Sequence, residues 1–225
     1  MMDWLSAIGQ YVNPEYIIET GGFAILLLIV FAETGLFFGF FFPGDSLLFT
    51  AGLLASMGIL PTHIVLLLIG LTSAGIAGNF AGYWFGSSMG AKLFNKKDSL
   101  IFKKKYLMMT QGFYDRYGKM ALIAGRFLPI IRTFAPIMAG VIKMDFKKFV
   151  IYNVAGSFLW VFSFTLAGYF LGMAFPNIKD YLEYIVLGLI IVTIIPVIRT
   201  YLRERKKYDA KMLAEQKEAL EERLK

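Results

Sequence analysis

Two arginines and two prolines stand inside one long apolar stretch, residues 126–140, and this combination constrains the fold more than any other feature. They are Arg126, Pro129, Arg132 and Pro136. A guanidinium group in hydrocarbon costs about 3 kcal/mol on insertion scales, and a proline inside a helix removes a hydrogen bond. A solvated cytoplasmic loop is the simpler interpretation, but the flanking runs 121–125 and 134–142 are too apolar for one. We therefore expect a bent, membrane-buried segment whose arginines face a partner or a water-filled cavity.

A second apolar stretch, residues 33–52, carries acidic side chains instead. Its charged residues are Glu33 and Asp45, and Pro43-Gly44 interrupts it. The planar fork of arginine suits phosphate or carboxylate, and carboxylates inside a membrane take part in proton relays. Two acids in one broken stretch and two arginines in the other predict one central polar site for an anionic head group, with protonation of Glu33 or Asp45 as a coupling step.

The composition is that of a membrane protein. The 225 residues are 57% hydrophobic with a mean hydropathy of +0.62, whereas soluble domains are about 45–50% apolar. This length allows four to six passes of about 20 residues each. Cysteine is absent, which excludes disulfides and thiolate metal sites. We expect an all-α integral membrane protein with a single polytopic domain over residues 1–200 and a charged tail over 201–225.

The positive charge is concentrated in two segments. Residues 1–91 contain no Lys or Arg, residues 92–119 contain eight, and residues 199–225 contain nine. The positive-inside rule makes both basic segments cytoplasmic, and with them the C-terminus. We read the charge as a topology signal rather than as nucleic-acid binding. No basic region precedes the first apolar run, so residues 1–22 do not resemble a cleaved signal peptide.

Hydrophobic periodicity predicts spans, hairpins and one surface helix. The predicted spans cover residues 23–42, 64–85, 149–172 and 181–199. Residues 36–55 and the arginine stretch are expected to form two re-entrant helical hairpins, which are tolerated at depth only when packed in protein or lining a cavity. Apolar side chains at helical spacing in 99–117 predict a cytoplasmic amphipathic helix. We expect a basic cytoplasmic turn at 143–148 and a turn on the far side at 175–179.

Short internal similarities suggest two related halves. Asn79-Phe-Ala-Gly82 is echoed by Asn153-Val-Ala-Gly156, and both broken stretches end in Ala-Gly. The halves would cover about 22–91 and 120–200 in opposite orientation, joined by the amphipathic linker 92–119. This predicts an inverted-repeat, transporter-like fold in which broken helices meet near the midplane.

Four pieces of sequence carry a resemblance to a known family. They are Glu33 with Phe42-Pro-Gly-Asp-Ser46, Gly78-Asn-x-x-Gly-Tyr-Trp84, Arg126-Phe-x-Pro-x-x-Arg-Thr-Phe-x-Pro136 with Ala139-Gly140, and Tyr152-Asn153 with Gly156 and Trp160. The sequence resembles the DedA family of bacterial inner-membrane proteins over most of residues 30–172. The resemblance implies two facing re-entrant hairpins and lipid transport, with undecaprenyl phosphate returned across the cytoplasmic membrane. In some members phosphatidylethanolamine and proton-dependent physiology are implied instead.

The resemblance also implies that Glu33, Asp45, Arg126 and Arg132 are the functional residues. The full set of candidate substrate-binding residues is Glu33, Asp45, Ser46, Asn79, Arg126, Arg132, Thr133 and Asn153. A purely structural interpretation stays open, in which pairs of the type Glu33–Arg126 and Asp45–Arg132 only hold the hairpins together. The sole histidine, His63, cannot build a common zinc site, so we expect no metal and no cofactor.

Four functions remain open at this stage. The first is a lipid translocase, and the second is a proton- or cation-coupled small-solute transporter. The third is a membrane enzyme acting on a lipid phosphate, which would need Asp45 or Ser46 as its nucleophile; we expect a non-enzyme. The fourth is a scaffold that binds through 99–117 or the tail. Expected partners are membrane lipids and protons but no nucleic acid, and faces of small residues permit a homodimer.

Overall fold

Every regular element in the described part of the chain is a helix. The computed structural model describes residues 14–36, 44–89, 104–175 and 188. The α-helices are α2 (Pro14–Gly35), α3 (Gly44–Ser56), α4 (Ile64–Met89), α6 (Lys104–Tyr117), α7 (Ala121–Ala124), α8 (Pro129–Val141) and α9 (Phe146–Ala174). Two short 3-10 turns, η2 (Gly118–Met120) and η3 (Gly125–Phe127), flank α7. The all-α prediction is confirmed, whereas the predicted span 181–199, the turn 175–179 beyond Phe175 and the tail 201–225 lie outside the described residues.

Two helices, α4 and α9, are long and apolar enough to cross a membrane. They have 26 and 29 residues, and each contains a long apolar stretch with few charged side chains. At about 1.5 Å per residue they measure about 39 and 44 Å, which exceeds the roughly 30 Å of a hydrocarbon core. The predicted spans 64–85 and 149–172 are therefore confirmed as helices, and each helix is longer than predicted.

The predicted basic turn at 143–148 is wrong in its extent. The Asp145 carboxylate accepts a hydrogen bond of 3.0 Å from the backbone N–H of Lys148 and so caps the start of α9. A carboxylate suits this position because the first N–H groups of a helix have no partner within the helix. The turn therefore ends at Asp145, and Lys147 and Lys148 already belong to the helix.

The first apolar helix ends before the predicted span does. Within α2 the backbone kinks at Gly22, where φ is 58°. The helix stops at Gly35, whereas the prediction ran to residue 42; residues 37–43 lie outside the described part. A Cβ at Gly35 would lie 2.8 Å from the Gly78 carbonyl oxygen. A glycine here thus lets α2 touch α4, and glycine is also the poorest helix former except proline.

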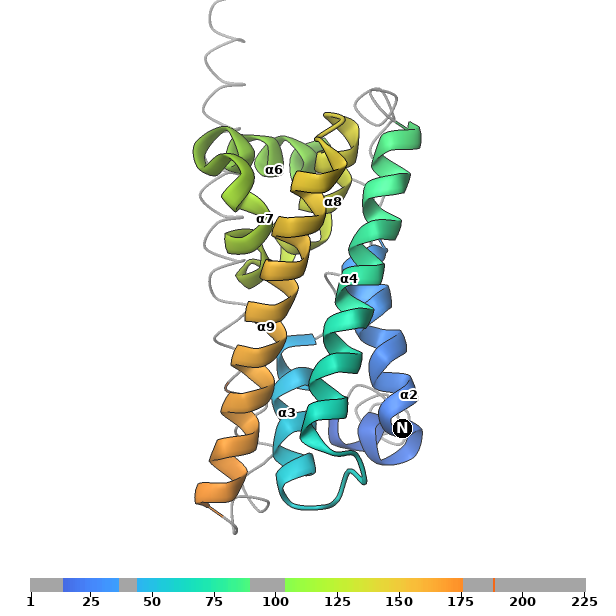
Figure 1. Ribbon diagram of the computed structural model, residues 1–225, viewed down its shortest axis with the longest axis vertical. Coiled ribbons are helices and arrows are strands. Elements are labelled where there is room, and N and C mark those ends of the chain that lie inside the picture. The colour runs from blue at the N-terminus through green and yellow to red at the C-terminus, as the bar shows by residue number, and fades with distance from the viewer. Residues whose placement is uncertain (1–13, 37–43, 90–103, 176–187, 189–225) are drawn as a thin grey trace, which may run out of the picture.

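The helices α3 and α8 are too short to span a membrane. Each has 13 residues, about 20 Å. In Figure 1, α3 occupies the lower half of the molecule and packs along α9, and α8 occupies the upper half and packs along α4. Asp45 and Arg132 lie in the first turns of α3 and α8 and pair with each other. The N-termini of the two short helices therefore meet.

The two prolines of the arginine stretch act differently from one another. Pro129 is the first residue of α8, directly after Leu128, which has extended dihedrals of φ −118° and ψ 109°. Proline suits this position because its missing N–H would be unpaired there. Pro136, by contrast, lies inside α8 without ending it, so the expected break occurs at one proline and not at both.

Glycines bring each short helix against a long helix of the other half. A side chain at any of four glycines would overlap a backbone carbonyl oxygen of the facing helix. These contacts are Gly52 with Thr165, Gly168 with Phe49, Gly140 with Tyr83, and Gly86 with Ile137. The α3–α9 and α8–α4 interfaces thus repeat one arrangement. On every helix, the glycine lies three residues after the residue whose carbonyl oxygen meets the glycine of the facing helix.

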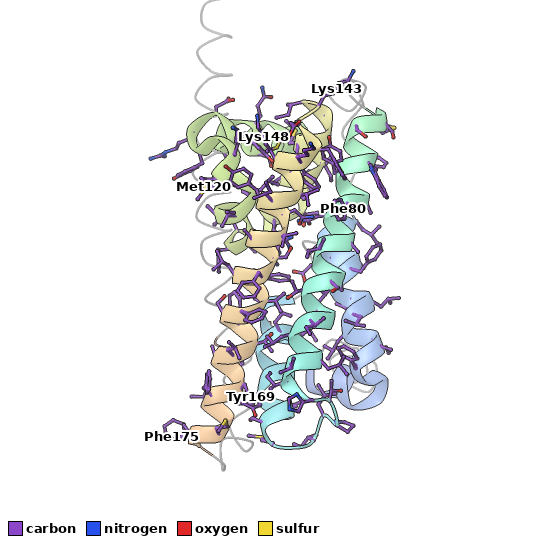
Figure 2. All side chains as sticks on the ribbon, viewed as in Figure 1. Phe80, Met120, Lys143, Lys148, Tyr169 and Phe175 are labelled. Atoms are coloured by element: carbon purple, nitrogen blue, oxygen red, sulfur yellow. The ribbon has the colours of Figure 1, made fainter. Side chains whose placement is uncertain are left out.

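The amphipathic segment lies at the end of the molecule that carries the basic turn. Its described part, α6, packs against α8, and the Tyr114 hydroxyl donates a 3.1 Å hydrogen bond to the Ala135 carbonyl. Figure 2 shows Lys143 and Lys148 at this end and Tyr169 and Phe175 at the opposite end. The predicted helix 99–117 is confirmed over 104–117, and residues 99–103 lie outside the described part.

Candidate functional site

One guanidinium group, that of Arg132, holds both carboxylates. Its Nη2 donates to Glu33 Oε1 and its Nη1 donates to Asp45 Oδ1. All three side chains are buried, Glu33 completely so. Glycine at 44 makes this approach feasible, since a Cβ there would overlap the Glu33 carboxylate. The fork of arginine suits this bridging position because it presents several donors in one plane.

The Asp45 carboxylate has a second donor besides Arg132. The Trp160 indole N–H donates a 2.7 Å hydrogen bond to Asp45 Oδ1, the oxygen that Arg132 also holds. Asp45 also lies in the first turn of α3, where the helix dipole favours negative charge. Arg132, Trp160 and the helix N-terminus therefore all hold this buried carboxylate in place.

Arg126 follows a different pattern, because its partners are neutral. Its Nη2 donates to Asn153 Oδ1 at 3.0 Å and to the Ser157 hydroxyl at 2.5 Å. Asn153 Oδ1 also accepts a 2.7 Å hydrogen bond from Asn79 Nδ2, and the Asn153 amide donates to the Ile76 carbonyl. These contacts fix one side of the Arg126 guanidinium group.

Several buried polar atoms of the site have no hydrogen-bond partner among the described residues. They are Nε and Nη1 of Arg126, Nε of Arg132, Oε2 of Glu33 and Oδ1 of Asn79. Arg126 is only 1% exposed. A buried charged donor without a partner is costly, so the two free donors of Arg126, one on each edge of its guanidinium group, are suited to bind an anion.

The indole ring of Trp160 faces both arginines. The guanidinium carbon of Arg132 lies 4.6 Å from the ring centroid, and that of Arg126 lies 5.7 Å from it. Both distances are within the range of a cation–π interaction. Both cations therefore lie against the same indole ring.

The site lies at half the length of the long helices. Trp160 is the middle residue of α9, and Asn79 is near the middle of α4. With all four ionisable groups charged, two guanidinium groups balance two carboxylates. Within the described ranges, no group of three or more His, Asp or Glu side chains could hold a metal ion. The arrangement is thus a buried site of two acids and two arginines, with free donors on Arg126.

Comparison with known proteins now adds to this geometry. Residues 42–170 match the VTT domain family. The chain is 42% identical over 184 residues to the protein DedA of Escherichia coli K12, which covers 82% of this chain and 84% of that protein. The chain belongs to the DedA family.

Other relatives of this DedA-family chain are named as membrane proteins. An uncharacterized membrane protein of Mycobacterium tuberculosis is 38% identical over 198 residues, which covers 87% of this chain and 82% of that protein. The inner membrane protein YghB of E. coli K12 is 34% identical over 173 residues, 76% of each chain. No solved structure matches significantly. Together with α4 and α9, these names establish a membrane protein.

The structure brings the four predicted ionisable residues together, but with one pairing changed. The Asp45–Arg132 pair forms, whereas the Glu33–Arg126 pair does not, because Glu33 also takes Arg132. The match to the VTT domain begins at residue 42, so Glu33 reaches the site from outside the matched segment. The functional roles of these residues stay predictions.

The remaining predicted residues have varied contacts. Asn79 and Asn153, which were predicted as echoes of each other, are hydrogen-bonded partners. The Thr133 hydroxyl donates to the Glu33 carbonyl at 3.4 Å and to the Pro129 carbonyl at 3.3 Å, so it ties α8 to α2. Ser46 is buried in the first turn of α3.

Two residues of the site, Ser157 and Trp160, were missing from the predicted set. Both are buried and touch the arginines. They follow Asn153 by four and seven residues, so all three lie on one face of α9. That spacing was a usable signal, because it places the side chains of Asn153, Ser157 and Trp160 toward the same neighbour, Arg126.

Proposed function

We propose that this DedA-family protein moves a lipid with a phosphate head group, undecaprenyl phosphate, across the bacterial cytoplasmic membrane for reuse in envelope synthesis. The observation that carries the proposal is the pair of free donors on Arg126. Its Nε and Nη1 are buried and have no partner among the described residues, and arginine N–H donors bind phosphate oxygens.

The direction of the short helices supports an anionic substrate. Asp45 lies in the first turn of α3 and Arg132 in the first turn of α8, so both helices direct their N-termini at the site. Helix N-termini carry partial positive charge and bind phosphate. Broken helices whose N-termini face a midplane site are also the way in which several transporters hold anionic groups.

The double pairing of Arg132 suggests how protons enter the cycle. Glu33 and Asp45 occupy two of its donors, so a lipid phosphate that engages Arg132 must compete with them. A proton on Glu33 would neutralise one competitor and release Nη2 for the phosphate. Proton uptake at Glu33 or Asp45 would thereby favour lipid binding.

The proposed topology is multi-pass, with two re-entrant hairpins in halves of opposite orientation. The reciprocal contacts of α3 with α9 and of α8 with α4 support this arrangement. The end bearing α6 and the Lys143–Lys148 segment is cytoplasmic in this proposal, as is the C-terminus, because basic residues favour that side. A homodimer is compatible with it.

Phosphatidylethanolamine is the second candidate substrate. Oε2 of Glu33 is buried without a partner among the described atoms, and a carboxylate oxygen there would accept the ammonium group while Arg126 takes the phosphate. A proton-coupled small-solute transporter would use the same carboxylates and need no lipid. The three proposals therefore differ in the substrate that Arg126 must bind.

The proposal describes a carrier and not a lipid phosphatase. An enzyme would need Asp45 or Ser46 as a nucleophile. Ser46 is buried in the first turn of α3, and Asp45 Oδ1 already accepts hydrogen bonds from Arg132 and Trp160. An oxygen held by two donors is a poor nucleophile. Release of inorganic phosphate from the lipid by the purified protein itself would contradict this part of the proposal.

Reconstituted vesicles test the proposed function. Undecaprenyl phosphate is placed in both leaflets, and an external phosphatase that cannot cross the membrane hydrolyses only the outer pool. Active protein is expected to expose the inner pool, and Arg126→Gln to lower that rate by about 10-fold or more, since a hydrogen bond to a charged group contributes about 1.5–3 kcal/mol. Arg126→Lys, which keeps the charge but lacks the fork, should be intermediate.

Matched controls separate the alternatives. Arg116→Gln makes the same change at an exposed position of α6 and should transport normally. Fluorescent phosphatidylethanolamine, quenched by external dithionite, tests the second candidate in the same vesicles. If the Arg126→Gln variant exposes the inner pool of undecaprenyl phosphate at the normal rate, the proposed role of that side chain is wrong. Proton flux without any of these lipids would favour the small-solute transporter.

A further inference from the structure

Trp160 contacts several charged residues of the site, although it was not among the predicted site residues. Its side chain is completely buried. It donates a hydrogen bond to Asp45 and presents its ring to Arg126 and Arg132. Three of the four ionisable side chains of the site thus contact a single indole, although that indole carries no charge.

We propose that Trp160 is a positioning residue for substrate binding, in which the indole N–H fixes Asp45 and the aromatic ring fixes both guanidinium groups. This inference rests on the proposed function and assigns the arrangement of its binding site to one side chain. Trp160 acts through the charged residues, and it is not proposed to bind the lipid itself.

The hydrogen bond from the Trp160 indole N–H to Asp45 makes the two carboxylates differ in how easily they can separate from Arg132. Asp45 Oδ1 has two side-chain donors, Arg132 and Trp160, the latter at 2.7 Å, whereas the Glu33 carboxylate has one side-chain donor among the described residues, Arg132, besides the backbone of Gly44. Asp45 is therefore the fixed carboxylate of the pair and Glu33 the one free to change partners. Without the indole N–H, this difference between the two acids would be reduced.

The ring of Trp160 helps to hold the guanidinium groups of Arg126 and Arg132 near one another. Like charges repel one another, and few neighbours of Arg126 are anionic, since its described partners are Asn153 and Ser157. A negative aromatic face attracts both guanidinium groups without occupying any of their N–H donors. It therefore holds Arg126 in place while leaving Nε and Nη1 available to a phosphate.

Side chains of one helix, α9, contact both arginines of the site. Asn153, Ser157 and Trp160 lie on one face of that helix, and each contacts Arg126. The first two give Arg126 its hydrogen bonds and the third gives it an aromatic support. A movement of α9 would consequently shift Arg126 and Asp45 together.

Tryptophan analogues at this single position test the proposal with little change in shape. The chain has three tryptophans, so Trp4→Phe and Trp84→Phe leave only Trp160; Trp84 is 61% exposed. Fluorinated tryptophans weaken the negative ring face and keep the N–H. Benzothienylalanine keeps a bicyclic ring of the same shape and lacks the N–H.

Transport of undecaprenyl phosphate in the vesicle assay is the readout, with KM and maximal rate measured for each analogue. Increasing fluorination is expected to raise KM in steps, by about 3-fold to 10-fold overall, because Arg126 is held less firmly. Benzothienylalanine is expected to lower the maximal rate by about 5-fold or more, because Asp45 loses its second donor. A residue that only fills space would show neither trend.

A binding measurement provides the second readout. Farnesyl phosphate, added to the protein with Trp160 as its only tryptophan, should change the emission of Trp160, and Arg126→Gln should abolish that change. Flat KM and rate across all analogues, in a parent protein that transports normally, would overturn the proposal and leave the proposed function intact. Failure of the parent protein to transport either lipid would instead overturn the proposed function.

Discussion

Arg132 illustrates how much one side chain can organise in a buried site. Its two terminal nitrogens hold two carboxylates that come from α2 and α3, and its ring contact with Trp160 adds α9. A lysine would offer a single nitrogen and no plane, so it could not bridge the same two acids in this way. The helices that meet at the site are therefore linked through one guanidinium group.

Removing Arg132 should destabilise the protein strongly. Arg132→Gln leaves two buried carboxylates without their cation, and breaking a buried pair costs about 3–5 kcal/mol. The combined variant Arg132→Gln, Glu33→Gln and Asp45→Asn removes the unpaired charge. It should recover most of the lost thermal stability in detergent while remaining inactive in transport. A triple variant as unstable as Arg132→Gln alone would show that the ion pairs are not the cause.

At this scale the sequence predicted which charges converge but not how they pair. Two acids and two arginines in apolar surroundings must compensate one another, and that requirement can be read without coordinates. The choice of Arg132 by both acids depends on the reach and orientation of side chains across three helices. Trp160 was missed as a site residue because an indole in a span is ordinarily a packing residue.

Close backbone contacts at glycines join the short helices to the long ones, in addition to the buried apolar side chains of the core. The short helices α3 and α8 each press a glycine against the opposing long helix and receive another from it. Helices in membranes commonly approach at small residues, since lipid supplies no hydrophobic drive for association. These contacts fix the depth to which each short helix enters.

Alanine at these glycines should therefore weaken both interfaces to a similar degree. In Gly52→Ala or Gly140→Ala the new methyl group meets backbone atoms, of Thr165 and Tyr83 respectively, so the helices must separate. We expect a loss of roughly 1–3 kcal/mol, as for overpacking in a core, measured by thermal unfolding in detergent.

Gly82→Ala is the matched control for these two variants. Its nearest contact, Pro136 Cβ, lies at 3.4 Å, which is ordinary van der Waals contact, so stability should stay within about 0.5 kcal/mol of the parent. Equal losses in all three variants would show that helix separation is not the reason.

The elements themselves were predictable where the apolar pattern was long. The spans that became α4 and α9 were found because more than twenty apolar residues leave few alternatives. The start of α9 was misplaced because the run 143–148 was read as charge alone, whereas Asp145 is a helix cap. Pro136 was expected to break α8, but a helix buried among neighbours can accommodate a proline.

The whole molecule has two chemically different ends, and this asymmetry predicts its orientation. Lys143 and Lys148 lie beside α6 at one end, and Phe175 lies at the other (Figure 2). Because the natural chain has no cysteine, single cysteines report on each end without any background reaction. Lys147 and Phe175 are both exposed.

In intact cells, a membrane-impermeant maleimide should label Phe175→Cys but not Lys147→Cys. Opening the cells should expose Lys147→Cys to the reagent as well. The physical reason is the preference of basic residues for the cytoplasmic side. The reverse labelling pattern would contradict the proposed topology.

The equal numbers of acidic and basic groups at the site determine how membrane voltage acts on this protein. With Glu33, Asp45, Arg126 and Arg132 all ionised, the empty site is neutral, so an electric field does no net work when those groups move together. A bound phosphate adds negative charge, and each elementary charge crossing 100 mV changes the free energy by about 2.3 kcal/mol. A proton that travels with the lipid cancels one such charge. Membrane voltage should therefore change the transport steps of the lipid-loaded protein far more than those of the empty protein. The voltage dependence of the transport rate would then show how many protons accompany each lipid.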